Sequence, residues 1–591
     1  MRTLKLFLTG AAVALALLAP GPALAAATDE TPKKPHILLV VVDDFGYNNI
    51  GYHRTEYTNG KYEAEVNTPT LDRLMRQGIK LNRHYVYNYC SPSRSSLQSG
   101  RLPVHVSVEN TNPVAVNPND PVSGFSGIPR NMTGIASKLR SAGYRTHMTG
   151  KWDAGMATWD HTPMGRGYET FLGYYHHAND EWTETLSTGS VVHGDMCSKF
   201  GPELVDLWNT TGPAIGLNGT GFEDQIFADN SLQIIRDHDP SEPLFLFHSF
   251  RSVHTPLQIP SENEKQYLFL LNKHKRRYAA MVAFMDTVVG DLVSALAEKD
   301  MWKDTFMVLT SDNGGPIYGI IPPGSLLPRP VFGAANNLPL RGGKLADWEG
   351  GIRVNAFVSG GALAAAKRGT VLEDYIHIAD WYATFCEAAG VDPTDDRAAA
   401  ANLPPIDSIS HWKRLTTTQE DAANQRTEIH VSAMALIQGK YKIVTGTDNE
   451  IAYDFLNMTK TGLMPFDVHA VGYGPSAIKN TLTLGRDCTA GCLFDIIADP
   501  NEDNEITKDN PEIVAKMMAR LKELNKNNFH PDRGQPSKLA CTVSNKLYSG
   551  FYGPFIDVPG FPSSLADHAQ HQVAPARENV HLEHVAQLLR S

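Results

Sequence analysis

Four apolar runs divide the first half of the chain. They cover His36 to Asp43, Tyr144 to Thr149, Pro243 to Phe250 and Thr305 to Thr310. Continuous apolar runs of this length are typical of strands that a parallel sheet buries on both faces. Helical stretches separate them, for example Asn67 to Gln77 and Tyr278 to Glu298. This alternation predicts an α/β fold with a large, mostly parallel sheet flanked by helices.

From about Glu428 the pattern changes. Glu428 to Leu436 and Lys440 to Thr445 alternate like two paired antiparallel strands joined at Gln438-Gly439. A helix is predicted from Pro511, with an apolar face made by Ile513, Val514, Met517, Leu521 and Leu524. We therefore expect a large domain over residues 33–425 and a smaller α+β domain with an antiparallel sheet over 428–530. A tail at 531–591 is left unassigned.

The first 25 residues have the pattern of a secretory signal peptide. Arg2 and Lys5 precede an apolar run from Leu6 to Leu18, and Ala23-Leu24-Ala25 is a small-residue cleavage site. The run is too short to span a bilayer comfortably, so we expect no stable membrane insertion. An uncleaved anchor is the alternative, and the Ala-x-Ala ending argues against it. We expect a protein that is secreted or directed to a lysosome-like compartment.

Sequons and cysteines fit an oxidising compartment. The glycosylation candidates are Asn131, Asn209, Asn218 and Asn457. Cys488 and Cys492 are close enough in sequence to pair locally, and Cys197 and Cys541 could join distant segments. Cys386 lies in a helix-like stretch and is expected to be a buried thiol.

Charge narrows the classes of partner. The formal net charge is −11, which gives no reason to expect nucleic-acid binding, since that usually requires a basic surface. An anionic substrate must therefore be held by a local cluster of cations rather than by the overall field.

Polar residues follow each of the four predicted strands. The strand ends carry Asp43-Asp44, Lys151-Trp152-Asp153, Arg251-Ser252-Val253-His254 and Asp312-Asn313. In open α/β sheets, sites assemble at the carboxyl ends of the strands. We therefore expect carboxylates, a lysine, a histidine and an amide to meet at one edge of the sheet.

Two of these strand ends predict a metal site. Asp43 and Asp44 follow a buried strand directly, and a cation best relieves their mutual repulsion. Asp312 and Asn313 add oxygen ligands of the same kind, and oxygen-only ligation favours Ca²⁺ or Mg²⁺ over zinc. The alternatives are a solvated acidic turn at Asp43-Asp44 and a plain turn at Asp312-Asn313-Gly314-Gly315.

Other residues predict an anion site. Cys90-Ser91-Pro92-Ser93-Arg94 enters a predicted helix, whose N-terminus favours a bound anion. Lys151, His254 and Lys344 lie at strand ends or in glycine-rich segments rather than on exposed helix faces. A lone lysine is usually solvated and a lone histidine usually structural, so the interpretation of these three depends on their neighbours.

Taken together, these motifs resemble the formylglycine-dependent sulfatases, and the arylsulfatase B-like branch most closely. The C-x-P-x-R segment at Cys90 is joined, in family order, by the segments at residues 42–47, 149–152, 252–257, 311–315, 336–344 and 348–353. The resemblance covers roughly residues 35 to 360 strongly. It extends weakly to about residue 525 through Leu493-Phe494-Asp495 and Asp499-Pro500.

The resemblance implies an alkaline-phosphatase-like catalytic domain that hydrolyses sulfate esters of a small molecule or a glycan. It implies that a formylglycine-generating enzyme oxidises Cys90 to formylglycine. The implied Ca²⁺ site, with Mg²⁺ as the alternative, consists of Asp43, Asp44, Asp312, Asn313 and residue 90. The residues implied to bind and polarise the sulfate are Arg94, Lys151, His254 and Lys344, with His254 as the general acid.

One position departs from the family pattern. Many relatives have Gly-Lys-Trp-His where this chain has Gly150-Lys151-Trp152-Asp153. We hypothesise that Asp153 is the base for release of sulfate from residue 90, because a carboxylate can accept the same proton. The alternative is that His161 fills the vacant imidazole position.

Two other functions could use the same residues. A related metal hydrolase would cleave phosphate or phosphonate esters, but the single-cation carboxylate set and the C-x-P-x-R segment argue against it. An inactive sulfated-glycan-binding relative would keep Cys90 as a thiol. Asp153, in place of the family histidine, would then be a sign that catalysis has been lost. No motif sets an oligomeric state.

Overall fold

The computed structural model describes residues 34–58, 63–106, 108, 112–186, 197, 203–317, 319–320, 331–418, 425–447 and 487–558. The predicted signal peptide, the sequon at Asn457 and the tail beyond residue 558 lie outside the described residues. All the elements below belong to one compact unit, Pro35–Ser591.

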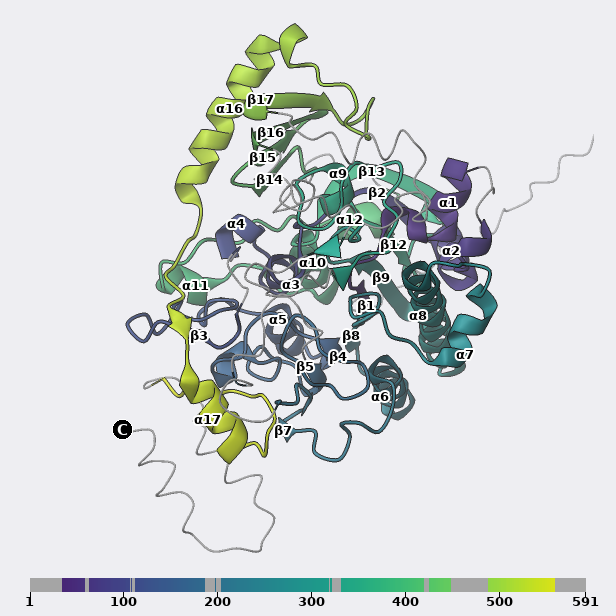
Figure 1. Ribbon diagram of the computed structural model, residues 1–591, viewed down its shortest axis with the longest axis vertical. Helices are drawn as coiled ribbons and strands as arrows, with labels where there is room; N and C mark the ends of the chain where they lie inside the picture. Colours follow the sequence, from purple (N-terminus) through teal and green to yellow (C-terminus); the bar gives the residue numbers. More distant parts are fainter. Residues whose placement is uncertain are drawn as a thin grey trace, which may run out of the picture. The chain divides into compact units, whose positions relative to one another are not determined.

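A mixed, mostly parallel sheet of ten strands forms the centre of this unit, in the order β13-β2-β12-β9-β1-β8-β4-β5-β6-β7 (Figure 1). The strands are β1 His36–Val42, β2 Ile79–Tyr85, β4 Arg145–Lys151, β5 Thr170–Tyr174, β6 Trp208–Asn209, β7 Gly212–Pro213, β8 Leu244–Ser249, β9 Thr305–Ser311, β12 Ala356–Ser359 and β13 Thr370–His377. Strands β9, β1, β8, β4 and β5 run parallel, whereas β12, β6 and β7 are antiparallel to their neighbours. The four predicted strands are confirmed, and they lie side by side.

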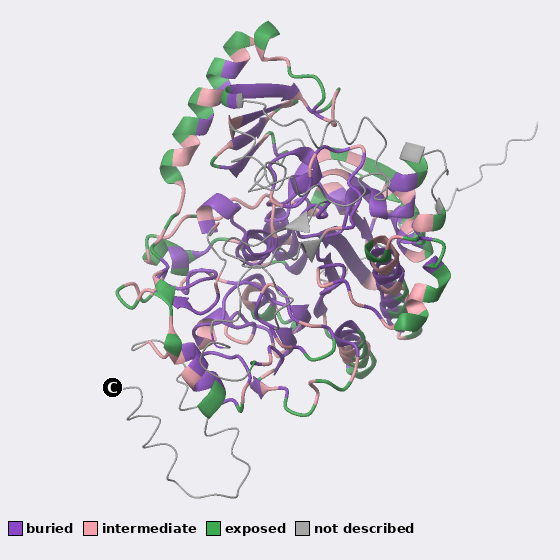
Figure 2. Cartoon of the chain, in the orientation of Figure 1, coloured by how far each residue is buried: buried purple, intermediate pink, exposed green. Residues whose placement is uncertain are grey.

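Helices cover both faces of the sheet. Leu38, Val40 and Val42 of β1 pack with α2 (Pro69–Gln77), α6 (Glu223–Asp237) and α8 (Lys273–Glu298). Ile37, Leu39 and Val41 point to the other face, against α3 (Cys90–Ser99), α5 (Ile135–Ser141) and α10 (Asp380–Ala389). Figure 1 shows α6 and α8 on one side of the central strands and α3 and α5 on the other, and the strands are buried in Figure 2. Burial on both faces explains why the strand signal was a continuous apolar run.

Helix α8 starts earlier than predicted. The apolar stripe predicted a start near Tyr278, but the helix begins at Lys273, where the Asn272 side chain accepts hydrogen bonds from the backbone of His274 and Lys275. The first turn is polar and basic, so periodicity alone did not reveal it. Of the described helices, α8 alone is long and apolar enough to cross a membrane, and 67% of its most apolar window is buried in the protein.

A second sheet follows in sequence, and all its pairings are antiparallel. It consists of β14 (Glu428–Ser432), β15 (Ala435–Gln438), β16 (Tyr441–Thr447) and β17 (Asp487–Asp495). The predicted single strand from Glu428 to Leu436 is wrong, because a turn at Ala433-Met434 divides it, with Ser432 Oγ accepting a hydrogen bond from the Met434 backbone. The turn consists of apolar residues and contains no Gly, Pro, Asn or Asp, so no turn signal marked it. Helix α16 (Pro511–Leu524) packs on Leu436, Ile443 and Leu493 with its predicted apolar face.

Apart from three-residue 3₁₀ helices, the remaining described elements are short. They are α1 Gly51–Thr58, α4 Pro103–Val106, α7 Ser261–Glu264, α9 Glu349–Ile352, α11 Asp396–Ala400, α12 Trp412–Thr416, α17 Lys538–Lys546, the strand pair β3 Ala115–Val116 with β18 Gln535–Pro536, and the pair β10 Gly319–Ile320 with β11 Val331–Phe332. The beginning of the unassigned tail is thus ordered by pairing with β3. The division into domains at residues 425–428 stays a prediction.

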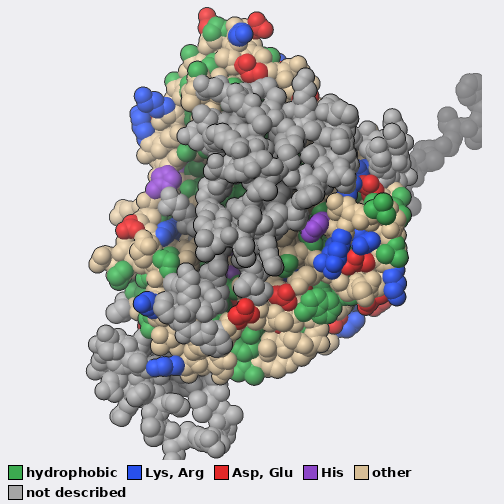
Figure 3. Space-filling view, in the orientation of Figure 1, with side chains coloured by type: hydrophobic (Ala, Val, Ile, Leu, Met, Phe, Trp, Pro, Cys, Tyr) green, Lys and Arg blue, Asp and Glu red, His purple; other side chains and the backbone are tan. Residues whose placement is uncertain are grey.

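The cysteine pairings are confirmed. Disulfides join Cys197 to Cys541 and Cys488 to Cys492, and Cys386 is a buried free thiol. Of the sequons, Asn209 is exposed and Asn131 and Asn218 are half-buried, so glycosylation stays a prediction. Figure 3 shows acidic and basic side chains interspersed on the visible face.

A buried ion pair joins the second sheet to α9, and it generates a stability prediction. The Lys442 ammonium lies 2.7 Å from Glu502 and 3.2 Å from Glu349, with all three side chains fully buried. Lys442→Met would leave Glu502 without its cation and Glu349 with only Arg353, 3.7 Å away, so we expect a loss of about 3–5 kcal/mol in the free energy of unfolding. Urea denaturation of the purified protein measures this.

Lys440 provides the matched control on the same hairpin. Its ammonium pairs with Asp495 at 2.6 Å, but its side chain is 54% exposed. Lys440→Met should leave the urea midpoint nearly unchanged, because water replaces an exposed pair. Equal effects of the two substitutions would contradict the assignment.

Candidate active site

The carboxyl ends of β9, β1, β8 and β4 meet at one edge of the central sheet, as the sequence predicts. The four strands are parallel neighbours, and their registers pair Val42 with Ser311, Val41 with Ser249 and Ser249 with Gly150. The polar residues that follow them are therefore brought together. Lys344 reaches the same place from a separate segment.

Cys90 is the first residue of α3, and its neighbours are charged. Its Sγ donates to Asp43 Oδ1 at 3.4 Å and accepts from Lys344 Nζ at 3.3 Å, and the residue is 3% exposed. Burial, and next the charge of Asp43, raise the pKa of the thiol well above its usual value. An unmodified Cys90 is thus a neutral thiol rather than a thiolate nucleophile.

Three cations each pair with a different carboxylate. Lys151 Nζ lies 2.5 Å from Asp43, Arg94 Nε lies 2.8 Å from Asp312, and Lys344 Nζ lies 2.6 Å from Asp44. All six side chains are at most 9% exposed. The cations come from three separate segments, so the charge balance exists only in the folded chain.

The three carboxylates do not share these cations equally. Burial alone would raise the pKa of Asp43, but Lys151, His254 and Arg94 outweigh it and hold that pKa far below its ordinary value. Burial and the negative charge of Asp43 instead raise the pKa of Asp44, and they raise that of Asp312 to about 7. The cluster therefore carries negative charge that its own cations do not fully compensate.

This donor set fits a hard divalent cation. Ligand atoms of Asp43, Asp44, Cys90 and His254 lie within 4.8 Å of one another. The buried Oδ1 of Asn313 has no hydrogen-bond partner among the described residues. An orphaned oxygen beside undercompensated carboxylates is what a Ca²⁺ or Mg²⁺ ligand sphere would use. His254 was predicted to meet these carboxylates as a sulfate-binding residue and not as a metal ligand, and its Nε2 lies 3.7 Å from Asp44 Oδ2.

The turn after β1 has an uncommon backbone conformation. Asp44 has φ +59°, in the left-handed region that side chains other than Gly, Asn and Asp seldom adopt. The Tyr278 hydroxyl donates to the Asp44 carbonyl at 2.9 Å and accepts from the Gly46 backbone at 3.0 Å. The first buried residue of α8 thus fixes the turn after β1.

Arg94 is held by more than its carboxylate. Its Nη1 donates to the Lys151 carbonyl at 2.9 Å and to Ser249 Oγ at 2.7 Å. Its buried Nη2 makes no hydrogen bond within the described part of the chain, although Asp43 lies 3.9 Å away. A guanidinium nitrogen of this kind is available to an anion. Ser249 was not predicted, although it is the polar residue just before the end of the predicted strand Pro243 to Phe250.

Hydrogen bonds within its own loop orient His254. Its Nδ1 donates to the Thr255 carbonyl at 2.6 Å, which directs Nε2 toward Asp44. The buried Arg251 donates to the His254 carbonyl at 3.0 Å and pairs with Glu181 at 2.9 Å. Burial, and next Lys344, lower the pKa of His254 well below its usual value. An anionic substrate nearby would favour the protonated form.

Asp153 lies within the cluster, whereas His161 does not pair with it. The Asp153 carboxylate is 3.7 Å from Lys151 Nζ and 2.8 Å from Nδ1 of His177. His161 instead bonds Thr158 and packs against Phe125. Sequence reasoning missed His177. The signal that could have found it is the carboxyl end of β5, a strand that was not predicted.

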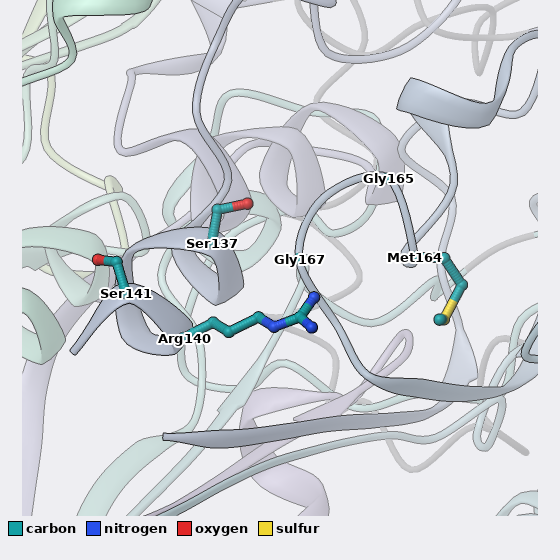
Figure 4. Close-up of a pocket in the computed structure, with 6 residues that line it drawn as sticks. All are labelled: Ser137, Arg140, Ser141, Met164, Gly165 and Gly167. Atoms are coloured by element: carbon teal, nitrogen blue, oxygen red, sulfur yellow. The ribbon is translucent and has the colours of Figure 1, made fainter. Parts of the chain in front are cut away.

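A shallow pocket of about 440 Å³ lies elsewhere, beside α5. It is lined by Ser137, Arg140, Ser141, Met164, Gly165 and Gly167 (Figure 4), and no predicted site residue is among them. Its volume does not by itself indicate a chemical function.

Known proteins resemble the chain in sequence. Mouse arylsulfatase J is 29% identical over 556 residues, which cover 90% of this chain and 83% of that protein. Rat N-acetylgalactosamine-6-sulfatase is 29% identical over 386 residues, covering 65% and 66% of the two chains.

Solved structures share the fold. One is Ps i-CgsB in complex with a neocarrahexaose, with a TM-score of 0.61, 21% identity, and coverage of 87% of this chain and 97% of that one. Another is the PsFucS1 sulfatase from Pseudoalteromonas sp., with a TM-score of 0.59, 22% identity, and coverage of 85% and 92%. These likenesses support an alkaline-phosphatase-like fold.

A family model described as Sulfatase matches residues 35–391, which include every residue of the candidate active site. The chain therefore belongs to the sulfatase family, and it is an enzyme that hydrolyses sulfate esters.

Proposed function

We propose that this sulfatase acts on a sulfated carbohydrate, through formylglycine formed from Cys90 and with a bound Ca²⁺, for which Mg²⁺ is the alternative. The observation that carries the proposal is the placement of Cys90. It lies at a helix N-terminus, between the carboxylates that would hold a cation and the cations that would hold a sulfate. The sugar sulfatase among the sequence relatives supports the carbohydrate substrate.

Charge balance supports this assignment. Four buried carboxylates, those of Asp43, Asp44, Asp312 and Asp153, face three permanent cations. The cluster is therefore one negative charge in excess when all its carboxylates are ionised. A divalent cation and a singly charged sulfate ester would together make it neutral, which a buried site strongly favours.

Asp43, Asp44, Asp312, Asn313 and residue 90 would hold the cation, as the family resemblance implies, with His254 facing the same space. When bound, the cation would acidify a hydroxyl on residue 90 and stabilise the charge on the sulfuryl oxygens. Formylglycine hydrate would supply two hydroxyl groups, one to attack sulfur and one whose proton loss expels sulfate.

The chain's own residues perform the remaining tasks. Arg94 Nη2, Lys151 and Lys344 would donate to the sulfuryl oxygens, and these preorganised cations favour the transition state, in which charge builds up. Burial would lower the pKa of Lys151, but Asp43 outweighs it and keeps the ammonium protonated. His254 would protonate the leaving ester oxygen from Nε2. Asp153 would take the last proton from residue 90.

Two disulfides support an oxidising compartment, and hence the secretory route on which the cysteine would be modified. The leader at residues 1–25, the secreted or lysosome-like location and the glycans at the sequons are parts of the same proposal.

The proposal is tested first by turnover and by the chemistry of residue 90. Protein made in cells that contain a formylglycine-generating enzyme should hydrolyse an aryl sulfate and far less of the matched aryl phosphate. Mass spectrometry of the peptide containing residue 90 should show loss of the thiol sulfur and gain of an aldehyde. Cys90→Ala should reduce turnover to background, because the nucleophile is removed.

Cys386→Ala is the matched control, since Cys386 is the other buried free cysteine of the described chain. It should keep the aldehyde and the activity. A fully active protein whose Cys90 thiol can still be alkylated would rule out formylglycine chemistry. Desulfation of a panel of sulfated polysaccharides then identifies the substrate.

Cation binding should depend on pH in a defined direction. Without the cation, the pKa of Asp312 is raised from 3.8 to about 7, so the folded state holds a proton that the unfolded state releases. That contribution to stability is lost as pH rises between about 4 and 7. Ca²⁺ must displace this proton, so the rise in Tm on adding Ca²⁺ to chelator-treated protein should be larger at pH 8 than at pH 5.5.

The expected stabilisation is about 2.7 kcal/mol at a hundredfold excess of Ca²⁺ over its Kd. Asp312→Asn should abolish the Ca²⁺-dependent rise. Asp395→Asn, which breaks the buried pair with Arg101 outside the site, should lower Tm but keep the Ca²⁺ response. If the Ca²⁺-dependent rise in Tm were the same at both pH values and in the Asp312→Asn variant, this cation site would be refuted.

The general-acid role of His254 predicts a dependence on the leaving group. His254→Ala should slow hydrolysis of a sugar sulfate by about 10²–10⁴-fold, because an alkoxide leaves poorly without a proton. An aryl sulfate with an acidic phenol needs little protonation and should lose much less. Steady-state kcat on both substrates measures the difference, and equal losses would assign His254 to binding alone.

A further inference from the structure

The carboxylate of Asp153 is held between two basic side chains. His177 Nδ1 lies 2.8 Å from one carboxylate oxygen and 3.0 Å from the other, and Lys151 Nζ lies 3.7 Å away on a second side. The Asp153 side chain is 4% exposed and that of His177 is 18% exposed. The order from the interior outward is therefore Lys151, Asp153, His177.

Two adjacent strand ends create this arrangement. Strands β4 and β5 are parallel neighbours that pair Lys151 with Tyr174, and the Trp152 backbone donates to the Tyr174 carbonyl at 3.0 Å. Asp153 and His177 follow at the same edge. The Trp152 indole donates to two backbone carbonyls, those of Gly155 and His161, and so anchors the turn that contains Asp153.

Asp153 has φ +49°, one of the left-handed backbone conformations at this edge. Asp adopts this region more readily than most residues, and here the turn anchored by Trp152 holds it there. Burial would raise the pKa of Asp153, but His177, Lys151 and Arg94 outweigh it and keep the carboxylate ionised. A buried, ionised carboxylate needs hydrogen-bonding partners, and these fix its orientation.

We propose that His177 is a positioning residue that holds the Asp153 carboxylate for proton uptake from residue 90 and keeps it off Lys151. This inference rests on the proposed function. Lys151 already pairs with Asp43 at 2.5 Å and is needed for the sulfate. With the His177 bond lost, the Asp153 carboxylate would be free to close on Lys151, which lies only 3.7 Å away. The imidazole that the family pattern places at position 153 is thus supplied here from the neighbouring strand end, one step further from the reacting atoms.

The release step defines what should fail. One hydroxyl proton on residue 90 passes to an Asp153 oxygen, the electron pair of that O–H bond forms the carbonyl, and the bond from carbon to the sulfate oxygen breaks. Sulfate leaves with the electron pair of the broken C–O bond. A misplaced Asp153 would slow this step more than the attack on sulfur, so sulfate should stay on the protein.

The test compares His177→Ala and His177→Asn in the full-length, formylglycine-containing enzyme. His177→Ala should lower kcat roughly tenfold to hundredfold, as is typical of residues that orient a functional group. KM for an aryl sulfate should not rise, and rapidly quenched samples should retain sulfate on the peptide containing residue 90 by mass spectrometry. His177→Asn places an amide donor near the Nδ1 position and should recover most of kcat.

His176 is the matched control, because it is the adjacent histidine and also pairs with an aspartate, Asp206, at 2.8 Å. His176→Ala should keep kcat and retain no sulfate, and thermal unfolding of each variant reports on folding. The double variant Asp153→Asn with His177→Ala should lose no more than Asp153→Asn alone, because both changes act on one group.

Several outcomes would overturn the inference. They are an unimpaired His177→Ala enzyme, losses that are additive in the double variant, or no recovery by His177→Asn. If the wild type turns over aryl sulfate and Asp153→Asn is impaired but His177→Ala is not, only the role of His177 fails. A wild type without formylglycine would instead overturn the proposed function.

Discussion

Mutual compensation of buried charge is the constraint on which the rest of this site depends. Removing an ion from water costs several kcal/mol, and only close partners offset the cost. Asp43 with Lys151, Asp312 with Arg94 and Asp44 with Lys344 meet at 2.5 to 2.8 Å, with almost no exposure. Each of these charged side chains can be buried because a side chain of opposite charge lies beside it. On the proposed function, a divalent cation and a singly charged sulfate ester would together balance the residual negative charge.

The second sheet contributes to the same balance from a distance. Glu502 accepts from the Glu349 backbone at 2.7 Å, and its carbonyl accepts from Arg341 at 2.8 Å. Lys442 pairs with the carboxylates of both Glu349 and Glu502. These bonds tie down both ends of the segment that carries Lys344. The smaller sheet therefore helps to hold the Lys344 ammonium beside Cys90.

Much of this was accessible from the sequence, since the signals were local. Buried parallel strands give continuous apolar runs, so β1, β4, β8 and β9 and the polar residues after them could be located. The residues gathered around Cys90 are those that the motifs named. Features without a local signal were missed, namely the basic first turn of α8, the turn at Ala433-Met434 and the whole of β5. His177 was missed together with β5.

The sequence by itself determined which residue types are available at each strand end and that a cysteine would begin a helix beside them. It even showed that position 153 carries a carboxylate instead of an imidazole. Only the tertiary structure decided which cation pairs with which carboxylate and which histidine meets Asp153. Pairing depends on strand order and register between segments far apart in the chain, and hydrophobic periodicity contains no information on either. From the sequence, Asp153 was the expected base and His161 the alternative for the vacant imidazole position, whereas the neighbouring strand end brings His177 to within 2.8 Å of Asp153.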